Sequence, residues 1–431
     1  MKLPASVKNN LLLKITSVNS LAVLLKMLVT FVTQKVIAVV LGPSGVAQIG
    51  NFKNLLPMVE SLSTVGVFNG VVKYVAEHKE TPNELQKLFS TAFVFLIFGS
   101  LLVCLLLFFG APYLNDWVFG NNYDFVFVFR VLAIATPFIA LSSLLNAVIN
   151  GLSKYKVFLK ISIYVSVFTA ILVIILVYVN ALDGALFAMA IAPVFHLLFF
   201  GYLYLKVLKP YLNFKQLSFQ IPYANQLVVY IIMAFLSIVL SGFVDIKLRT
   251  FLIREIDVVD AGNWTGMTNI SNQYFTLVSA VFSLYVLPKF ATIKTSTQFR
   301  LEVLTIYKTL LPLFFIGCVL VYVCREWIIL IVQSPEFLGM KPLFKWQLLG
   351  DFVKIASLII AYQFLAKGLL KEFVITEIIS LVLFYGLSVT FINDLGAEGI
   401  VLAHFIRYVL YYFIVVFALR KHLFGDRELP E

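Results

Sequence analysis

The sequence predicts an all-α integral membrane protein with twelve transmembrane helices, arranged as two six-helix lobes that form a parallel tandem repeat. Of its 431 residues, 61% are hydrophobic and only 13% are charged, and the mean hydropathy is +0.97. An ordinary globular domain is about half apolar and about a quarter charged. Apolar runs of about 20 residues recur along the whole chain, and a run of that length crosses about 30 Å of hydrocarbon as a helix.

Hydropathy predicts twelve spans and a longer connection in the middle of the chain. The first six spans are expected at residues 13–40, 46–75, 85–109, 125–149, 157–179 and 185–205. The second six are expected at residues 227–253, 262–287, 301–323, 342–365, 373–391 and 399–419. We therefore expect an N-terminal lobe at residues 1–207, a cytoplasmic linker at 208–225 and a C-terminal lobe at 226–431.

The basic residues of the connections alternate from one side of the predicted membrane to the other. One side carries eighteen of them: Lys2, Lys8, Lys73, Lys79, Lys87, Lys154, Lys156, Lys206, Lys209, Lys215, Lys289, Lys294, Arg300, Lys367, Lys371, Arg420, Lys421 and Arg427. The opposite side carries only Arg254, Arg325 and Lys341. Because Lys and Arg accumulate in cytoplasmic loops, both termini are expected in the cytoplasm.

The two halves repeat at an offset of about 215 residues. The letters GLSK at residues 151–154 return as GLLK at 368–371, and DGA at 183–185 returns as EGI at 398–400. Each half holds an even number of predicted spans, so the two halves run in the same direction through the membrane. Parallel repeats of this kind occur in alternating-access transporters.

Charged residues inside the apolar spans are the main functional signal. A charge near the bilayer centre costs about 2.5 to 3.5 kcal/mol on insertion scales, so such residues usually face a bundle interior or a wet cavity. The charged and titratable residues within spans are Lys26, Lys35, Lys53, Glu60, Arg130, Asp245, Lys247, Arg249, Lys308, Asp351, Lys354, Glu377, His404 and Arg407.

Some of these charges are expected to pair on one helix face. Asp245 and Arg249 are spaced i,i+4, and Asp351 and Lys354 are spaced i,i+3. Arg249, together with Lys35 and Arg130, could instead extend to the membrane interface. After pairing, cations remain in excess, which favours an anion because phosphate accepts several charge-assisted hydrogen bonds from Arg and Lys.

Other chemistries lack support in the sequence. The three cysteines show no CxxC spacing and the four histidines do not cluster, so we expect neither a disulfide framework nor a metal site. The nucleotide-binding P-loop, the HExxH motif and the nucleophile elbow are absent, so we expect no cofactor and no catalytic residue. The net charge of +11 comes from short loops between spans, which argues against nucleic-acid binding. The triplets NWT at 263–265 and NIS at 269–271 match the glycosylation sequon, but are expected to be polar lining of the eighth span.

Four segments resemble a known family: LGPSGVAQIGNFKNLL at 41–56, GVFNGVVKYVAEH at 66–78, SLYVLPKF at 283–290 and LFKWQLLGDFVKI at 343–355. They resemble the Wzx-type polysaccharide flippases, namely the O-antigen translocases and the enterobacterial common antigen lipid III flippases. These belong to the multidrug/oligosaccharidyl-lipid/polysaccharide exporter superfamily. The resemblance implies two six-helix lobes around a central cavity in the bacterial inner membrane. It implies alternating access that carries an undecaprenyl-pyrophosphate-linked oligosaccharide from the cytoplasmic to the periplasmic leaflet.

The resemblance also assigns roles to residues. It implies a cationic, substrate-binding cavity formed by Lys26, Lys35, Lys53, Arg130 and Arg249. Structural or coupling charges are expected at Glu60, Asp245, Asp351, Lys354, Glu377 and Arg407, of which Glu60, Asp245 and Arg407 depart from the family pattern. The implied partners are the lipid-linked glycan, membrane lipids and other proteins of polysaccharide assembly, such as a polymerase and a chain-length regulator.

Two other functions compete with a flippase. A multidrug/cation antiporter of the same superfamily would place uncompensated Asp or Glu in its cavity, whereas the excess here is basic. An integral-membrane enzyme of envelope glycan assembly would carry a large external loop or a catalytic cluster of His or carboxylates. The outer loops of this sequence are short, so the pattern favours the flippase.

Overall fold

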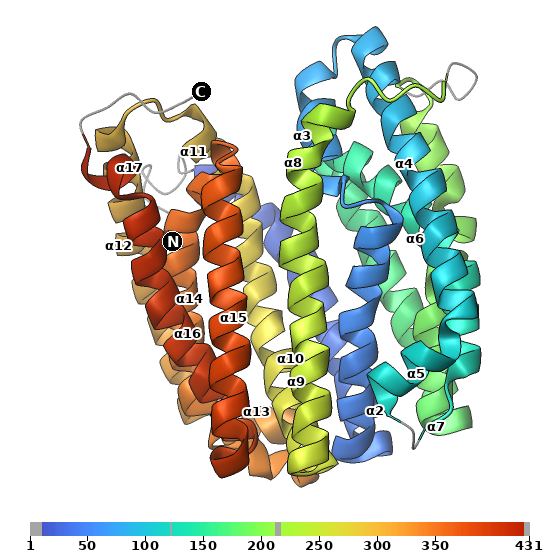
Figure 1. The fold of residues 1–431 in the computed structure, drawn as a ribbon, viewed down its shortest axis with the longest axis vertical. Coiled ribbons are helices and arrows are strands. Elements are labelled where there is room, and N and C mark those ends of the chain that lie inside the picture. The colour runs from blue at the N-terminus through green and yellow to red at the C-terminus, as the bar shows by residue number, and fades with distance from the viewer. Residues whose placement is uncertain (1–10, 121–122, 212–216, 426–431) are drawn as a thin grey trace, which may run out of the picture. The chain divides into compact units, whose positions relative to one another are not determined.

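The computed structural model describes residues 11–120, 123–211 and 217–425, and helices account for nearly all of them (Figure 1). The helices of the first half are α2 (Leu11–Ser63), α3 (Phe68–His78), α4 (Pro82–Phe109), α5 (Ala111–Phe119), α6 (Val126–Gly151) and α7 (Tyr155–Leu208). Those of the second half are α8 (Ala224–Ala234), η2 (Phe235–Leu240), α9 (Ser241–Glu255), α10 (Val258–Val281), η3 (Phe282–Val286), α11 (Leu287–Thr292), α12 (Ser296–Val323), α13 (Arg325–Val332), η4 (Pro335–Met340), α14 (Leu343–Ala366), α15 (Leu370–Leu395), α16 (Ala397–Ala418) and α17 (Arg420–Phe424).

Within these described ranges, nine helical stretches are long and apolar enough to cross a membrane. Two of them, Leu24–Ser63 and Leu159–Leu198, contain a backbone kink and hold two expected spans each. The kinks lie at Gly42 and at Asn180 and Ala181. With α10 as the remaining long helix, the helices match the twelve expected spans, and the predicted all-α fold is confirmed.

The second expected span is interrupted, which the sequence prediction missed. Helix α2 ends at Ser63 and α3 begins at Phe68. Between them, Val65 and Gly66 have φ angles of 54° and 69°. Glycine adopts this left-handed region at little cost, so Gly66 allows the chain to turn where a helix was expected. The prediction of one continuous helix over residues 46–75 is therefore wrong.

The described chain forms two compact units that do not coincide with the two sequence halves. One unit comprises Met1–Ala47 and Phe251–Glu431, and the other comprises Gln48–Thr250. The first expected span therefore packs with helices of the C-terminal half, and the seventh packs with helices of the N-terminal half. Unlike the expected linker at 208–225, the boundaries of the units lie within helices α2 and α9.

In each unit, a glycine allows close contact between a segment from one half of the sequence and a helix from the other half. In the first unit, a Cβ at residue 262 would lie only 2.2 Å from the carbonyl oxygen of Pro43. In the second unit, a Cβ at residue 70 would lie 2.5 Å from Cδ2 of Leu227. Real Cβ atoms do not approach other atoms this closely, so glycine is needed at residue 262, where the neighbour is backbone, whereas a Cβ at residue 70 would require the side chain of Leu227 to move.

Each unit has its own apolar core. In the unit of residues 48–250, Val71, Leu88 and Ile149 are buried where α3, α4 and α6 meet. In the other unit, Phe364 and Val415 belong to the core that joins α14 and α16. Many large apolar side chains lie on the outside of these helices, as expected for helices whose outer surface contacts lipid.

The backbone repeats at the offset seen in the sequence. Ser153 and Gly368, 215 residues apart, have φ angles of 55° and 62° and follow the ends of α6 and α14. Ala181 and Gly396, also 215 residues apart, have φ angles of 45° and 56°. Helices α4 and α12 have 28 residues each, and each is followed by a short helix, α5 or α13. These matches support a tandem repeat.

Candidate functional site

Asp351 is the centre of a polar network in the unit that contains α10, α14 and α16. Its side chain is completely buried, with 0% exposure. The carboxylate accepts hydrogen bonds from Ser271 Oγ at 2.6 Å and from the hydroxyl of Tyr274, both on α10. Gln347 Nε2 on α14 donates at 3.1 Å, and His404 Nε2 on α16 lies 2.9 Å from Oδ1. Such a set of donors satisfies a buried carboxylate that would otherwise be costly to desolvate.

The position of His404 depends on a close approach of two helices. Helices α14 and α16 pack along one another (Figure 1). A Cβ at residue 350 would lie 2.4 Å from Cδ2 of His404 and 3.1 Å from Cα of Phe405. Gly350 therefore leaves the space through which the imidazole reaches Asp351.

Lys354 follows Asp351 by one turn of α14 but does not pair with it as expected. Its Nζ lies 4.1 Å from the ring centre of Phe275 and 5.5 Å from that of Tyr408. In the part of the chain that the structure describes, the close contact of the Asp351 carboxylate is with the imidazole of His404, and it is an ion pair only when that ring is protonated. Lys354 acts on Asp351 electrostatically over a longer distance, because the imidazole of the neighbouring helix binds the carboxylate and the lysine extends over two rings.

Arg407 lies on the same face of α16 as His404 and is 9% exposed. Its Nε donates a hydrogen bond to Ser380 Oγ on α15 at 2.7 Å. Its guanidinium carbon lies 5.0 Å from the ring centre of Phe384 and 4.8 Å from that of Tyr408. Arginine favours such a setting because its planar, weakly hydrated group stacks on aromatic rings.

Glu377 on α15 is half-buried and interacts electrostatically with Arg407 and Lys354. Across the described residues, neither of these cations has a carboxylate within 4.0 Å, so the interaction acts over a longer distance. Glu377 of α15, Lys354 of α14 and Arg407 of α16 thus form a cluster of interacting charges, whose two cations lie over the ring of Tyr408.

The second unit holds a buried arginine. Arg249 on α9 is 3% exposed and donates from Nη1 to Oδ1 of Asn51 at 2.9 Å. Asn51 on α2 in turn donates from Nδ2 to the carbonyl oxygen of Val118 at 2.7 Å. Asp245, one turn earlier on α9, interacts electrostatically with Arg249, as its i,i+4 spacing predicts. Asn51 was not predicted, because nothing local in the sequence indicates a partner on another helix.

The remaining predicted cations differ in their surroundings. Lys53 on α2 is half-buried, whereas Lys26 and Glu60 on the same helix are exposed. Arg130 on α6 is exposed, and its guanidinium carbon lies 5.8 Å from the ring centre of Phe108. The residues predicted to line the cavity therefore differ in how exposed their side chains are.

Lys35 binds the end of a helix. Its Nζ donates to the carbonyl oxygen of Leu330 at 2.6 Å and to that of Gln333. These carbonyls belong to the last turn of α13 and to the residue after it. Lysine near a helix C-terminus satisfies carbonyls that have no partner inside the helix. This structural contact was not visible in the sequence.

The eighth expected span has a polar interior. Asn263, Thr265 and Ser271 on α10 are all buried. Ser271 donates a hydrogen bond to Asp351. These three residues of the two sequon triplets therefore line the inside of the unit, as predicted. Tyr274 and Gln347 were missed, although their spacing offered a signal: Tyr274 follows Ser271 by three residues and Gln347 precedes Asp351 by four.

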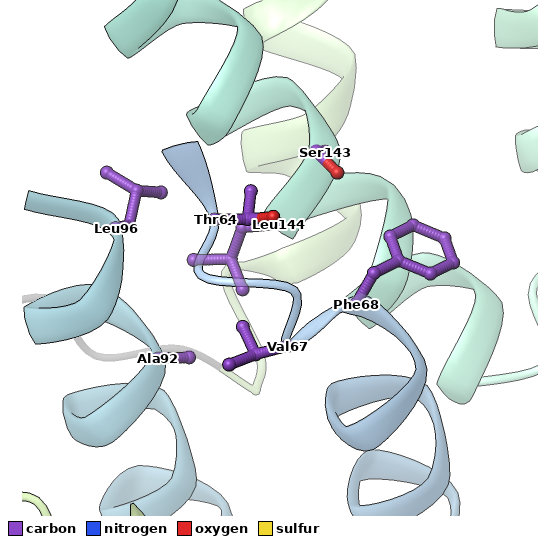
Figure 2. Close-up of a pocket in the computed structure, with 7 residues that line it drawn as sticks. All are labelled: Thr64, Val67, Phe68, Ala92, Leu96, Ser143 and Leu144. Carbon is purple, nitrogen blue, oxygen red and sulfur yellow. The ribbon is translucent and has the colours of Figure 1, made fainter. Parts of the chain in front are cut away.

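A small cavity adjoins the interruption between α2 and α3. Figure 2 shows its lining, which consists of Thr64, Val67, Phe68, Ala92, Leu96, Ser143 and Leu144. Its volume is about 10 Å³, close to the space that one water molecule needs. A glycan or a phosphate group is far larger than this cavity.

The chemistry available in these clusters is binding. The described residues contain no group of three or more His, Cys, Asp or Glu side chains placed to hold a metal ion. The buried Arg407 and the half-buried Lys354 over aromatic rings provide positive charge and flat apolar surfaces, which suit anions and sugars.

Comparison with known proteins gives a consistent picture. A family described as polysaccharide biosynthesis protein matches residues 54–342. The lipid III flippases of Escherichia coli (strain K12) and Shigella flexneri are each 27% identical over 378 residues, which cover 88% of this chain and 91% of theirs.

Solved structures share the fold. An inward-facing multidrug resistance transporter of the MATE family in the MOP superfamily has a TM-score of 0.70 and 14% identity, with 92% of this chain and 95% of that chain covered. The lipid II flippase MurJ, in an inward closed conformation, has a TM-score of 0.67 and 16% identity, with 94% and 87% covered.

Proposed function

The chain belongs to the polysaccharide biosynthesis protein family, and from this membership we propose that it is a flippase for a lipid-linked oligosaccharide. The substrate is an undecaprenyl-pyrophosphate-linked repeat unit of an O-antigen or of enterobacterial common antigen. It moves by alternating access from the cytoplasmic to the periplasmic leaflet of the bacterial inner membrane. A polymerase and a chain-length regulator would act on the exported product.

The similarity to the lipid III flippases carries this proposal, because it extends over 88% of this chain and 91% of theirs. The charges inside the spans agree with it. Arg249 and Arg407 are buried within apolar helices, at 3% and 9% exposure. A pyrophosphate is an anion that such cations stabilise, whereas a cationic drug would be repelled.

We propose that the positive charge of Lys26, Lys53, Arg130 and Arg249 attracts the pyrophosphate or an acidic sugar. Lys35, given its contacts with α13, contributes to the fold of its unit. Of the carboxylates, Asp245 interacts with Arg249 and can adjust the charge beside it, whereas Glu60 is exposed.

The orientation that we propose follows the positive-inside rule, with both termini in the cytoplasm. Reporter fusions after Lys79 and Lys294 should then report cytoplasm, and fusions after Asp257 and Gln333 should report periplasm. A reversed result at two of these sites would contradict the proposed orientation.

Complementation tests the function. The gene should restore surface polysaccharide in an Escherichia coli strain that lacks its lipid III flippase. Substitutions Lys26→Ala, Lys53→Ala and Arg249→Ala should each reduce export at an unchanged protein level, because each removes positive charge from a span. Lys87→Ala is the matched control, since its ammonium pairs with Glu84 at 2.8 Å on the exposed first turns of α4. Normal export by all three variants would contradict the role of these cations.

A further inference from the structure

His404 interacts with a carboxylate and with two cations. Oδ1 of Asp351 lies 2.9 Å from Nε2 of the imidazole. Lys354 and Arg407 interact electrostatically with the ring. The titratable and charged groups around the pair come from five helices: Tyr274 of α10, Cys318 of α12, Asp351 and Lys354 of α14, Glu377 of α15, and Arg407 and Tyr408 of α16.

Lys354 and Arg407 have the features of an anion site. Both lie over the ring of Tyr408, with Nζ at 5.5 Å and the guanidinium carbon at 4.8 Å from its centre. The hydrogen bond from Arg407 Nε goes to the neutral hydroxyl of Ser380, and Arg407 is more than nine-tenths buried. A buried guanidinium with a neutral hydrogen-bond partner and an ammonium that lies over the same aromatic ring are well suited to an anionic ligand.

The charges of the cluster balance when His404 is neutral. The positive charges of Lys354 and Arg407 equal the negative charges of Asp351 and Glu377. In that state, His404 donates its Nε2 proton to the Asp351 carboxylate, and a second proton on the ring would be opposed by the two cations. An anion bound to these cations offsets their charge and gives the cluster a net negative charge. A proton on the imidazole then offsets one of the negative charges that the anion brings.

From this arrangement we infer that Lys354 and Arg407 form an anion-binding site whose occupancy is coupled to the binding of one proton by the His404–Asp351 pair. The ligand is a pyrophosphate or the carboxylate of an acidic sugar, and in this respect the inference rests on the proposed function. Coupling between two sites is reciprocal. Anion binding therefore takes up a proton, and a lower pH strengthens anion binding.

Calorimetry on the purified full-length protein in nanodiscs tests the coupling. Farnesyl pyrophosphate serves as the pyrophosphate probe and glucuronate as the acidic-sugar probe, so the two arms distinguish the source of the anion. Binding measured in two buffers of different ionisation enthalpy gives the number of protons taken up. The wild type should take up a fraction of a proton near neutral pH, and its affinity should rise towards lower pH by at most about tenfold per pH unit.

Variants separate the parts of the site. His404→Gln keeps an N–H donor for Asp351 but cannot titrate. In this variant, the proton uptake on binding and the pH dependence of the affinity should fall to the part that comes from titration of the probe. His196→Gln is the matched control in the other unit, where the ring lies 2.7 Å from Thr169 Oγ1, and it should behave as wild type. Arg407→Gln should weaken probe binding at least tenfold.

Three results would overturn the inference: wild-type proton uptake by His404→Gln, unchanged affinity in Arg407→Gln, or probe binding to the wild type without proton uptake. The last measurement needs no variant, so misfolding of a variant does not remove the test. If neither probe binds while complementation succeeds, the inference fails and the proposed function stands. If complementation fails as well, the proposed function fails.

Discussion

Arg249 on α9 donates a hydrogen bond to Asn51 on α2 across 2.9 Å, although the two residues lie 198 positions apart in the sequence. The amide of Asn51 is held in turn by the carbonyl oxygen of Val118 at 2.7 Å. This buried pair joins a charged donor to a neutral acceptor, so Asn51 itself adds no negative charge beside the guanidinium, on which the carboxylate of Asp245 also acts.

Asn51→Asp should test whether that positive charge matters. The new carboxylate would pair with Arg249 and neutralise it, so the protein should remain folded while export falls. Gln48→Glu is the matched control, one turn earlier on α2 and also buried. The side-chain oxygen of Gln48 has no hydrogen-bond partner among the described residues, so we expect a carboxylate there to stay unpaired and to give less folded protein. Full export by Asn51→Asp would show that the charge of Arg249 is not used.

Lys35→Met should lower stability. The substitution leaves the carbonyl oxygens of Leu330 and Gln333 without their donor, which should cost about 1 to 3 kcal/mol. The free energy of unfolding in detergent, measured by denaturant titration, gives the value. Lys308→Met, at an exposed lysine of α12, is the matched control and should change stability little. If Lys35→Met is as stable as the control but exports less, Lys35 contacts the substrate instead.

Gly350→Ala should disrupt the contact between α14 and α16. Its Cβ would lie 2.4 Å from His404 and 3.1 Å from the backbone of Phe405, and overpacking of this kind costs about 1 to 3 kcal/mol. Gly386→Ala on α15 is the matched control, since no atom lies within 4 Å of its Cβ. Because alanine favours a helix over glycine by about 1 kcal/mol, that variant should be neutral or more stable. Equal melting temperatures for the two variants would contradict the packing argument.

The ion pair between Glu326 and Lys341 should make stability depend on pH. Lys341 Nζ lies 2.7 Å from Glu326 Oε1, and its hydrogen bond and charge hold the pKa of Glu326 below its ordinary value of 4.5. A carboxyl with a lowered pKa in the folded state stabilises the fold above pH 4.5, and this contribution is lost as pH falls through the folded value.

Glu326→Gln should therefore melt slightly below wild type at neutral pH and match it in acid. The effect is small because both side chains are partly exposed, at 34% for Lys341 and 56% for Glu326, and solvent screens the pair. High salt should reduce the difference at neutral pH. Glu326→Gln in a Lys341→Met background is the control, and a pH-dependent difference that persists there would assign the effect to another group.

The sequence by itself determined the class of the protein and its all-α fold. The thickness of the hydrocarbon layer sets the length of a spanning helix, so hydropathy, a local property, located most of the helices but missed the interruption between α2 and α3. The repeat was also visible, since the GLSK and GLLK motifs lie at the two turns where Ser153 and Gly368 share a backbone conformation, although the motif letters match two residues out of register with it. Charge within the spans predicted which residues matter, because burying a charge is costly wherever the chain folds.

Only the tertiary structure decided the partners of those charges. Asp351 pairs with His404 and not with Lys354, since the choice depends on how closely α16 approaches Gly350. Lys35 binds the end of α13, nearly 300 residues away. Helical spacing predicts which side chains share a face of one helix, but a partner on another helix is set by packing between helices. That packing depends on glycine contacts and kinks, which hydropathy does not encode.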